Sequence, residues 1–383
     1  MVLECGRVGE SWRSRRWDSF TLVTPNWTLQ LPGFPYQGSD PDGFLLRDEV
    51  VAYLERYVDL FHPPLRLGVR VTAVRSGPGS EGYLVEAEGE ELAARNVVVA
   101  TGLLEQPKIP ALSAGVPPDV RQIHSSQYRN PQALPPGAVL VVGSGQSGCQ
   151  IAEELNQSGR KVYLCVGSVG RVPRRYRGKD AIWWTNQRGG FDRTVEMLPT
   201  PRAKFVAHSH LSGKGPRGHT LNLHQFARDG VVLLGHLSRV EGTKIILAAD
   251  LRESLAKADA HAANLKREID QFVLDAGLVV PEESPTDDPT LRDGYGAEPI
   301  LELDMARDGI RSIIWATGYS FDFSWVKLPV FDQDGYPVQK RGVTAYPGLY
   351  FLGMAWLHNG KSGLLFGVGE DASHIAALIA ARA

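Results

Sequence analysis

The residues best placed to do chemistry form a glycine-rich turn. It follows an apolar run at residues 138–142 and opens a helical stretch at residues 147–157. In such a G-x-G-x-x-G sequence the first glycine permits a tight turn, the second lets backbone approach a pyrophosphate, and the third allows a helix to pack closely on a strand. The helix N-terminus then offers N–H groups to the phosphates. The turn therefore predicts a dinucleotide site made of Gly143, Ser144, Gly145, Gln146, Ser147 and Gly148.

The residues after the next apolar run indicate which dinucleotide binds. The run at 161–166 is not followed by the Asp or Glu that would accept a hydrogen bond from the ribose 2′-hydroxyl of NAD. Ser168, Arg171 and Arg174 follow instead. A hydroxyl and guanidinium groups suit a 2′-phosphate, because they can donate charge-assisted hydrogen bonds to it. We therefore expect NADP(H); the alternative is that Arg174 and Arg175 belong to a solvated loop.

A second dinucleotide fold is indicated at the start of the sequence. Met1-Val2-Leu3-Glu4 has the pattern of a strand that ends in an acid. Such an acid binds a ribose hydroxyl about 20 residues after a glycine turn of its own, and no such turn precedes Glu4 in the sequence. Taken alone, Glu4 is better explained as an ordinary acid at the end of a strand.

The elements that must position these residues alternate between strands and helices. Short, continuously apolar runs predict strands that are buried on both faces of a sheet, and amphipathic stretches between them predict helices. This alternation is typical of parallel sheets built from βαβ units. Pro131 to Gly137 is the expected domain boundary, and Pro281 to Gly296 is an expected surface loop. The predicted strands are residues 96–100, 138–142, 161–166 and 312–316, and the predicted helices are residues 147–157 and 250–276.

Composition limits the possible function classes. The 383 residues suffice for two or more domains, and 41 Lys and Arg against 43 Asp and Glu create no field that favours nucleic acid. Cys5, Cys149 and Cys165 form no Cys-x-x-Cys pair, which disfavours a zinc site and a thioredoxin-reductase-like dithiol. No apolar run reaches the roughly 18 residues of a spanning helix. A cytoplasmic protein without an integral membrane segment is expected.

Histidines gather in one polar stretch, but their neighbours do not predict a metal site. His208, His210, His219 and His224 have no acidic or thiolate residues between them, so a solvated loop and no metal are expected. The surrounding segment, residues 172–220, is dense in arginine, glycine and aromatic residues. It is where we expect contacts with substrate or cofactor.

Two short motifs that bracket the glycine turn carry a family resemblance. Residues 100–102 and 316–318 both read Ala-Thr-Gly at the end of an apolar run. With them, essentially the whole chain resembles the flavin-containing monooxygenases and the related bacterial flavoproteins assigned to potassium transport. In that family the two turns mark where the chain leaves and re-enters the FAD domain. Further similar segments are Val8 to Arg13, Leu22 to Trp27, Phe44 to Val58, Val69 to Val71, Gly348 to Gly353 and Lys361 to Gly367.

The resemblance implies an α/β fold with two dinucleotide-binding, Rossmann-like domains and with FAD and NADP(H) as cofactors. An NADP domain at 134–308 is expected to be inserted in a discontinuous FAD domain at 1–133 and 309–383. The family's first strand and glycine turn are absent, so we expect either that Met1 is a misassigned start or that the chain is a truncated product. The residues implied for flavin are Glu4, Trp12, Val71, Ala100, Thr101, Gly102, Thr317, Gly318, Gly353, Gly363 and Leu364.

The chain departs from the family's pattern near residue 124. His124 and Tyr128 match part of the family fingerprint, but Pro118 and Val120 stand where Phe and Gly are expected. His124 is either a residue that holds the two domains and NADP in register or a structural histidine. Tyr128 in place of Trp argues against a Baeyer–Villiger enzyme. The Asn that many relatives place beside the flavin does not align clearly, and Asn26 is the nearest candidate.

The function that the resemblance implies is an NADPH-dependent flavoprotein monooxygenase. In the family, reduced flavin and O2 form a C4a-(hydro)peroxyflavin that oxygenates a small organic substrate, so the chemistry is carried by the cofactor. Two alternatives stay open: a flavin reductase or dehydrogenase without oxygenation, and a non-catalytic nucleotide-sensing protein linked to ion transport. The expected partners are a small-molecule substrate and O2, and a homodimer is compatible with the sequence.

Overall fold

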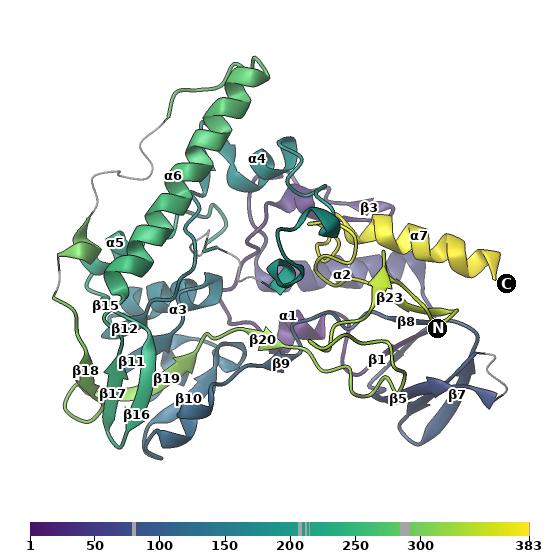
Figure 1. Cartoon of the computed structure of the whole chain (residues 1–383), viewed down its shortest axis with the longest axis horizontal. Coiled ribbons are helices and arrows are strands. Elements are labelled where there is room, and N and C mark those ends of the chain that lie inside the picture. Colours follow the sequence, from purple (N-terminus) through teal and green to yellow (C-terminus); the bar gives the residue numbers. More distant parts are fainter. Residues whose placement is uncertain are drawn as a thin grey trace.

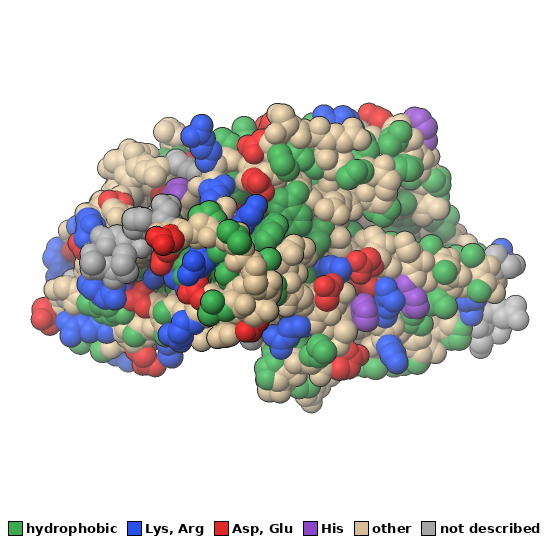
Figure 2. Space-filling view, turned by 90° about the horizontal axis from the view of Figure 1, so that it is seen from above, with side chains coloured by type: hydrophobic (Ala, Val, Ile, Leu, Met, Phe, Trp, Pro, Cys, Tyr) green, Lys and Arg blue, Asp and Glu red, His purple; other side chains and the backbone are tan. Residues whose placement is uncertain are grey.

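The protein has two halves, which lie side by side in Figure 1. The computed structural model describes residues 1–78, 82–205, 209–210, 213, 215–283, 292–296 and 298–382. One half surrounds a five-stranded parallel sheet, and the other contains several smaller sheets together with both termini (Figure 1). On the face seen in Figure 2, basic and acidic side chains of the described residues are interspersed, in keeping with the near-neutral composition.

The five-stranded sheet has the order β10-β19-β11-β12-β15, and all its neighbouring strands are parallel. All residues of β11 and β12 are buried, as their continuous apolar sequences predict. The predicted strand at 138–142 coincides with β11, and those at 161–166 and 312–316 overlap β12 and β19. The five strands are β10 (Arg121–His124), β19 (Ile310–Trp315), β11 (Ala138–Val142), β12 (Val162–Cys165) and β15 (Val232–Leu234).

Helices and a small antiparallel sheet complete this half. α3 (Gln146–Gln157) follows the glycine turn directly, and eight of its residues are buried. The long α6 (Leu251–Asp275) agrees with the helix predicted at 250–276. η6 (Val195–Met197) and η7 (Pro201–Phe205) contact the other half, through Val195 and Arg202. The remaining elements are α4 (Ala181–Gln187), α5 (Leu223–Arg228), β13 (Arg175–Tyr176), β14 (Lys179–Asp180), β16 (Leu237–Glu241), β17 (Lys244–Leu247), β18 (Glu302–Asp304) and η8 (Asp293–Tyr295).

The largest sheet of the second half, among its described residues, has four strands in the order β21-β22-β23-β8. β1 (Val2–Glu4) pairs in parallel with β4 (Leu65–Leu67), and β8 (Val97–Val99) pairs in parallel with β23 (Leu349–Phe351). Its other elements are α1 (Glu10–Ser14), α2 (Arg47–Phe61), α7 (Val368–Ala381), β2 (Gln30–Leu31), β3 (Phe34–Pro35), β5 (Val71–Ser76), β6 (Tyr83–Ala87), β7 (Glu90–Ala94), β21 (Gln339–Lys340), β22 (Val343–Thr344) and η1 (Asn26–Thr28).

Short antiparallel strands mark the passage between the halves. β9 (Gln106–Pro107) lies on the way out and pairs with β20 (Tyr319–Ser320) on the way back. The five-stranded sheet takes in β10 before residue 134 and β19 after residue 308, so it extends past both limits predicted for the NADP domain. The segments η3 (Ala111–Gly115), η4 (Ser125–Gln127) and η5 (Pro131–Ala133) lie around β10 in the sequence.

Two expectations about burial are wrong. β8 was predicted to be buried on both faces, but Val98 is 38% exposed, and β8 is the edge strand of its four-stranded sheet. The histidines were predicted to lie in a solvated loop, but His210 and His224 are 0% and 2% exposed, because α6 and the glycine turn supply them with polar partners. His208 and part of the 281–296 loop lie outside the described residues. Of the helices described, none is long and apolar enough to cross a bilayer.

Candidate functional site

The predicted dinucleotide residues meet at the carboxyl ends of the parallel strands. The glycine turn follows β11, Gly167 follows β12, and the second Ala-Thr-Gly turn follows β19. Ala316 N donates to the Val142 carbonyl at 2.9 Å, which fixes the second Ala-Thr-Gly turn against the start of the glycine turn. Ligands of open α/β sheets bind in the crevice at this edge.

Glycine stands at the positions of this turn for different structural reasons. A Cβ on Gly143, whose φ is +107°, would lie 2.6 Å from the Ala316 carbonyl oxygen. A Cβ on Gly148 would lie 1.8 Å from the Gly143 carbonyl oxygen, so this position admits no side chain. A Cβ on Gly145 would meet nothing within 4 Å. Gly143 and Gly148 are therefore required by packing, whereas Gly145 leaves room beside the N-terminus of α3 that a phosphate could fill.

Ser144 and His210 brace the turn from behind. The Ser144 hydroxyl accepts from Gly167 N at 2.9 Å, and the Ser144 carbonyl accepts from Nδ1 of His210 at 3.1 Å. His210 must therefore carry its proton on Nδ1. Burial, followed by the charge of Arg171, lowers the pKa of His210 to about 4, so the ring is neutral at pH 7. Its Nε2 finds no hydrogen-bond partner among the described residues.

The three residues predicted to bind the 2′-phosphate separate into two groups. Ser168 is exposed in the loop after β12, and Arg171 lies three residues further on with its guanidinium 3.1 Å from Asp259. Arg174 is 1% exposed and forms a buried ion pair with Asp180, the N-cap residue of α4. It also donates to the Val23 carbonyl at 2.7 Å and lies 4.8 Å from the ring centroid of Phe44. Because Arg174 already joins the two halves, we leave it out of the proposed phosphate site.

His124 links the end of β10 to the second Ala-Thr-Gly turn. Its Nδ1 accepts from Ser126 N at 3.2 Å, so the proton lies on Nε2, which donates to the Gly318 carbonyl at 2.9 Å. The ring also packs edge-on against Tyr319. Burial lowers the pKa of His124. These contacts are those of a neutral side chain that holds the chain where it returns to the second half.

The residues expected to hold flavin lie at several points of the second half. Glu4 ends β1; its carboxylate accepts from Gly6 N at 2.8 Å, and its carbonyl accepts from Val69 N at 3.0 Å, two residues before Val71. Trp12, on α1, packs edge-on against Phe20 with ring centroids 5.8 Å apart.

The two Ala-Thr-Gly turns end strands of different sheets. Ala100, Thr101 and Gly102 follow β8, and Gly353 follows the neighbouring β23, where Leu352 N donates to the Val99 carbonyl at 2.9 Å. A Cβ on Gly102 or on Gly318 would meet nothing within 4 Å, so both turns present open backbone. The Thr317 hydroxyl donates to the Lys108 carbonyl.

Two of the candidates for the flavin side have structural explanations. A Cβ on Gly363 would lie 2.9 Å from Ala355 N, so packing alone requires a glycine there. Leu364 N donates to the Lys361 carbonyl in a turn, and α7 begins at Val368. The amide of Asn26 is satisfied within the protein, since it donates to the Asp40 carbonyl at 2.9 Å and accepts from Leu45 N at 2.7 Å.

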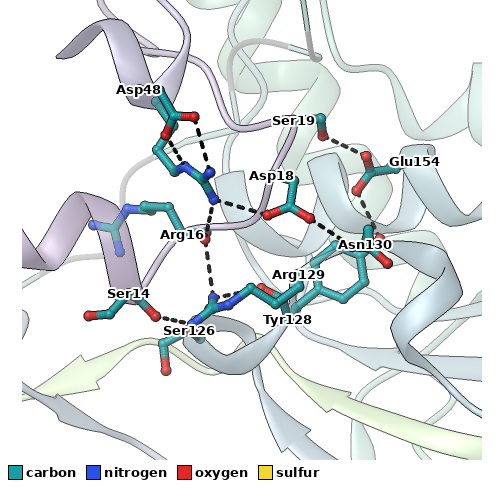
Figure 3. Close-up of polar contacts among 11 residues, drawn as sticks. Ser14, Arg16, Asp18, Ser19, Asp48, Ser126, Tyr128, Arg129, Asn130 and Glu154 are labelled. Atoms are coloured by element: carbon teal, nitrogen blue, oxygen red, sulfur yellow. Dashed lines mark hydrogen bonds and ion pairs between the residues drawn. The ribbon is translucent and has the colours of Figure 1, made fainter. Parts of the chain in front are cut away.

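Sequence reasoning missed a polar interface between the halves, which Figure 3 shows. Arg129 donates to the carbonyls of Arg16 and Ser126, each at 3.1 Å, and to that of Ser14. Glu154, on α3, accepts from Ser19 Oγ at 2.5 Å and from the Tyr128 hydroxyl at 2.8 Å. The signal in the sequence was the pair of acids, Glu153 and Glu154, within an amphipathic helix.

The remaining titratable clusters do not form a metal site or a dithiol. The described residues contain no group of three or more His, Cys, Asp or Glu side chains that could hold a metal ion. Cys149 and Cys165 are buried free thiols whose pKa is raised by burial, and Cys5 is a free thiol on the surface. His219 is paired with Glu153, whose hydrogen bond raises the pKa of His219.

Comparison with known proteins agrees with this architecture. The family profile described as Pyridine nucleotide-disulphide oxidoreductase matches residues 1–181. An uncharacterized CzcO-like oxidoreductase of Geobacillus kaustophilus is 31% identical over 371 residues, which cover 96% of this chain and 87% of that protein.

Solved structures share the fold at lower identity. The flavin-containing monooxygenase from Stenotrophomonas maltophilia superposes with a TM-score of 0.61 at 20% identity and covers 97% of this chain and 88% of its own. OTEMO, solved in complex with FAD and NADP, superposes with a TM-score of 0.53 at 16% identity over 98% of this chain and 79% of its own. The chain belongs to the CzcO-like oxidoreductases, and its fold is shared with the solved flavin-containing monooxygenase.

Proposed function

We propose that this oxidoreductase binds NADPH at the glycine turn and transfers its electrons to FAD, and that it oxygenates a small organic substrate. The observation that carries the proposal is the geometry of residues 143–148: packing demands two of the glycines, whereas Gly145 faces open space at the N-terminus of α3. A turn needed only for packing has no reason to leave that position bare. An approaching pyrophosphate supplies one.

NADP(H) is the nicotinamide cofactor that the residues present fit best. Ser168 and Arg171 follow β12 at the point where a ribose-binding acid would stand for NAD. The main chain beside Arg171 is bound to His210, whose ring holds the Ser144 carbonyl of the glycine turn. The main chain at Arg171 is therefore tied to the proposed pyrophosphate site, and a 2′-phosphate bound beside this loop could accept from the guanidinium.

For FAD, the residues present supply part of a site. Glu4 ends a strand as a ribose-binding acid would, and Gly102, Gly318 and Gly353 offer turns with positive φ, the first two with open space beside them. When bound, flavin would supply a two-electron acceptor for hydride and a route from the reduced ring to O2. The residues proposed to line it are Glu4, Trp12, Val71, Ala100, Thr101, Gly102, Thr317, Gly318, Gly353, Gly363 and Leu364.

The chain's own contribution is to hold the two halves in one arrangement. His124 donates to the Gly318 carbonyl, Arg174 donates to the Val23 carbonyl, and Arg129 binds carbonyls of residues 14 and 16. The contacts of Arg174 and Arg129 cross from one half to the other, whereas the contact of His124 fixes the turn after β19, where the chain returns to the second half. A fixed arrangement is what hydride transfer between two bound cofactors requires, because the reacting atoms must be held roughly 3 to 3.5 Å apart.

Aromatic residues support a substrate region in the segment at 172–220. Phe191, from this segment, packs edge-on against Phe366 at 5.0 Å, and Phe366 packs against Trp27 at 6.0 Å. Trp27 and Phe366 come from segments that resemble those of the family, and Phe191 comes from the segment where contacts with substrate or cofactor are expected. We therefore propose that a small, largely apolar substrate binds beside these rings.

A reductase without oxygenation and a nucleotide sensor linked to ion transport remain the competing functions. The test is to supply the purified chain with FAD, bleach the flavin with NADPH under anaerobic conditions, admit O2 and compare oxygenated product with hydrogen peroxide for a panel of small amines and sulfides. Product in proportion to NADPH supports the monooxygenase. Peroxide alone identifies a reductase, and NADPH binding without bleaching identifies a sensor.

We further propose a reducing, cytoplasmic setting, in which the cysteines stay unpaired. We also propose a homodimer, which sedimentation can test.

A further inference from the structure

Asp259 lies at the centre of a partly buried polar network behind Arg171. Its Oδ1 accepts from Arg171 at 3.1 Å, and its Oδ2 accepts from His224 Nε2 at 3.0 Å and from the Tyr295 hydroxyl at 2.9 Å. These donors come from the loop after β12, from α5 and from η8, while Asp259 itself lies on α6. Four segments therefore converge on one carboxylate.

The hydrogen bonds of His224 fix the direction of the network. Nδ1 of His224 accepts from Gly294 N at 3.1 Å, so its proton is on Nε2 and is donated to Asp259. Burial opposes ionisation of Asp259, but the hydrogen bonds from His224 and Tyr295, with the charge of Arg171, outweigh burial and lower its pKa to about 2. Asp259 is thus a carboxylate held by donors from three directions, and it cannot turn without losing at least one of them.

The other end of Arg171 is tied to the glycine turn. Val172 N donates to the His210 carbonyl and His210 N donates to the Gly170 carbonyl, each at 3.1 Å, so the chain around Arg171 runs in parallel with His210. The His210 ring in turn binds the Ser144 carbonyl. The backbone of Arg171 is therefore positioned by the dinucleotide turn and its guanidinium by Asp259.

We propose that Asp259 is a positioning residue that orients Arg171 for the 2′-phosphate of NADP(H), so that α6 helps to set the choice between NADPH and NADH. This inference rests on the proposed function, in which Arg171 binds that phosphate. A guanidinium fixed before the ligand arrives loses less conformational freedom on binding than a free one. A carboxylate close to a phosphate also repels it, so the two effects predict opposite results when the acid is neutralised.

The experiment measures Kd for NADPH and for NADH separately, by quenching of tryptophan fluorescence, in the wild type and in Asp259→Asn. Loss of one charge-assisted hydrogen bond should weaken NADPH binding about tenfold and leave NADH binding within about twofold. The matched control is Glu268→Gln, which removes a carboxylate from the same helix that is paired with Arg188 at 2.5 Å. This control should change neither Kd.

Several outcomes would overturn the inference. NADPH binding that is unchanged or tighter in Asp259→Asn would show that the acid only neutralises Arg171, and equal weakening of both nucleotides would show a merely structural role. If Asp259→Asn does not fold, Tyr295→Phe removes one donor from the same carboxylate and should weaken NADPH alone by about threefold.

Arg171→Ala distinguishes failure of this inference from failure of the proposed function. Loss of NADPH preference in Arg171→Ala, together with no effect of Asp259→Asn, overturns the positioning role alone. No change of preference in Arg171→Ala overturns both, because Arg171 would then not contact the 2′-phosphate.

Discussion

The two halves of the molecule differ in how completely their strands are covered. In the half with the glycine turn, β11 and β12 are buried along their whole length within a five-stranded sheet. In the other half, β1 and β8 lie in separate sheets of two and four strands, with Val2 and Val98 exposed by 50% and 38%. Buried apolar area is the main source of stability, so the first half should dominate the free energy of unfolding.

The two halves also differ in the groups that they offer to a ligand. The first half has a glycine turn, a helix N-terminus and an arginine fixed from two sides, and all of them are braced by hydrogen bonds within the protein. The second half offers an acid and open turns on smaller sheets. The nicotinamide site is therefore expected to be more rigid than the flavin site in the protein without ligands.

The largest effect should come from breaking the contact that joins the halves. Arg174→Ala would leave Asp180 buried without its partner, which costs roughly 3 to 5 kcal/mol of unfolding free energy. Urea unfolding followed by tryptophan fluorescence measures this loss. A matched variant, Arg202→Ala, removes an exposed partner of Asp334 and should cost less than about 0.5 kcal/mol. Similar losses in the two variants would contradict a joining role for Arg174.

Within the first half, two glycines of one turn should respond differently to alanine. Gly148→Ala places a Cβ 1.8 Å from a carbonyl oxygen and should destabilise the protein by roughly 3 kcal/mol. Gly145→Ala meets open space, so stability should change by less than about 0.5 kcal/mol while NADPH binding weakens at least tenfold, because the methyl group takes the place of the phosphate. Thermal unfolding and NADPH titration report the two effects. Unchanged NADPH affinity in Gly145→Ala would show that the pyrophosphate does not bind at this turn.

The braced turn should also make the first half sensitive to acid. His210 has a pKa of about 4 in the folded protein against an ordinary value of 6.5. Below pH 6.5 the unfolded chain takes up a proton that the folded chain refuses until about pH 4, so stability falls through this window by up to roughly 3 kcal/mol. Above pH 6.5 this histidine should have no effect on the pH dependence. Urea unfolding at pH 7.5, 5.5 and 4.5 should show a shallower decline for His210→Gln than for the wild type, and parallel declines would refute the buried, neutral ring.

The smallest expected losses of stability compare the same substitution in a strand of each half. Val141→Thr inserts a hydroxyl into the fully buried β11 and should cost roughly 2 kcal/mol. Val98→Thr, the same replacement on the partly exposed β8, should cost less than about 0.5 kcal/mol. Chemical denaturation of both variants gives the difference directly. Equal costs would mean that β8 is as well covered in solution as β11.

The sequence predicted the features that depend on local pattern. β11 coincides with the run predicted at 138–142, and the position of α3 follows from the glycine turn. Continuous apolar runs and glycine spacing are local patterns, so a single sequence is enough to predict the strand and the helix that they form. The two Ala-Thr-Gly turns were singled out by the family resemblance rather than by a local pattern alone.

The contacts that could not be predicted join residues far apart in the chain. Arg174 was expected at the 2′-phosphate, but its carbonyl partner is Val23, and Arg171 is held by Asp259 on α6. His224 was expected in solvent, yet its partners are Asp259 and Gly294. No local pattern encodes which acid meets which base after folding. The sheet also gains β10 and β19 from beyond the limits predicted for its domain, since strand order is a property of the tertiary fold.

The central claim is that the glycine turn and Arg171 form an NADP(H) site. Calorimetric titration of NADPH and NADH into the wild type and Arg171→Ala tests it most directly. The account predicts that the wild type binds NADPH at least tenfold more tightly than NADH, and that Arg171→Ala loses this preference while it still binds NADH. Equal affinities in the wild type, or a preference that survives in Arg171→Ala, would contradict it.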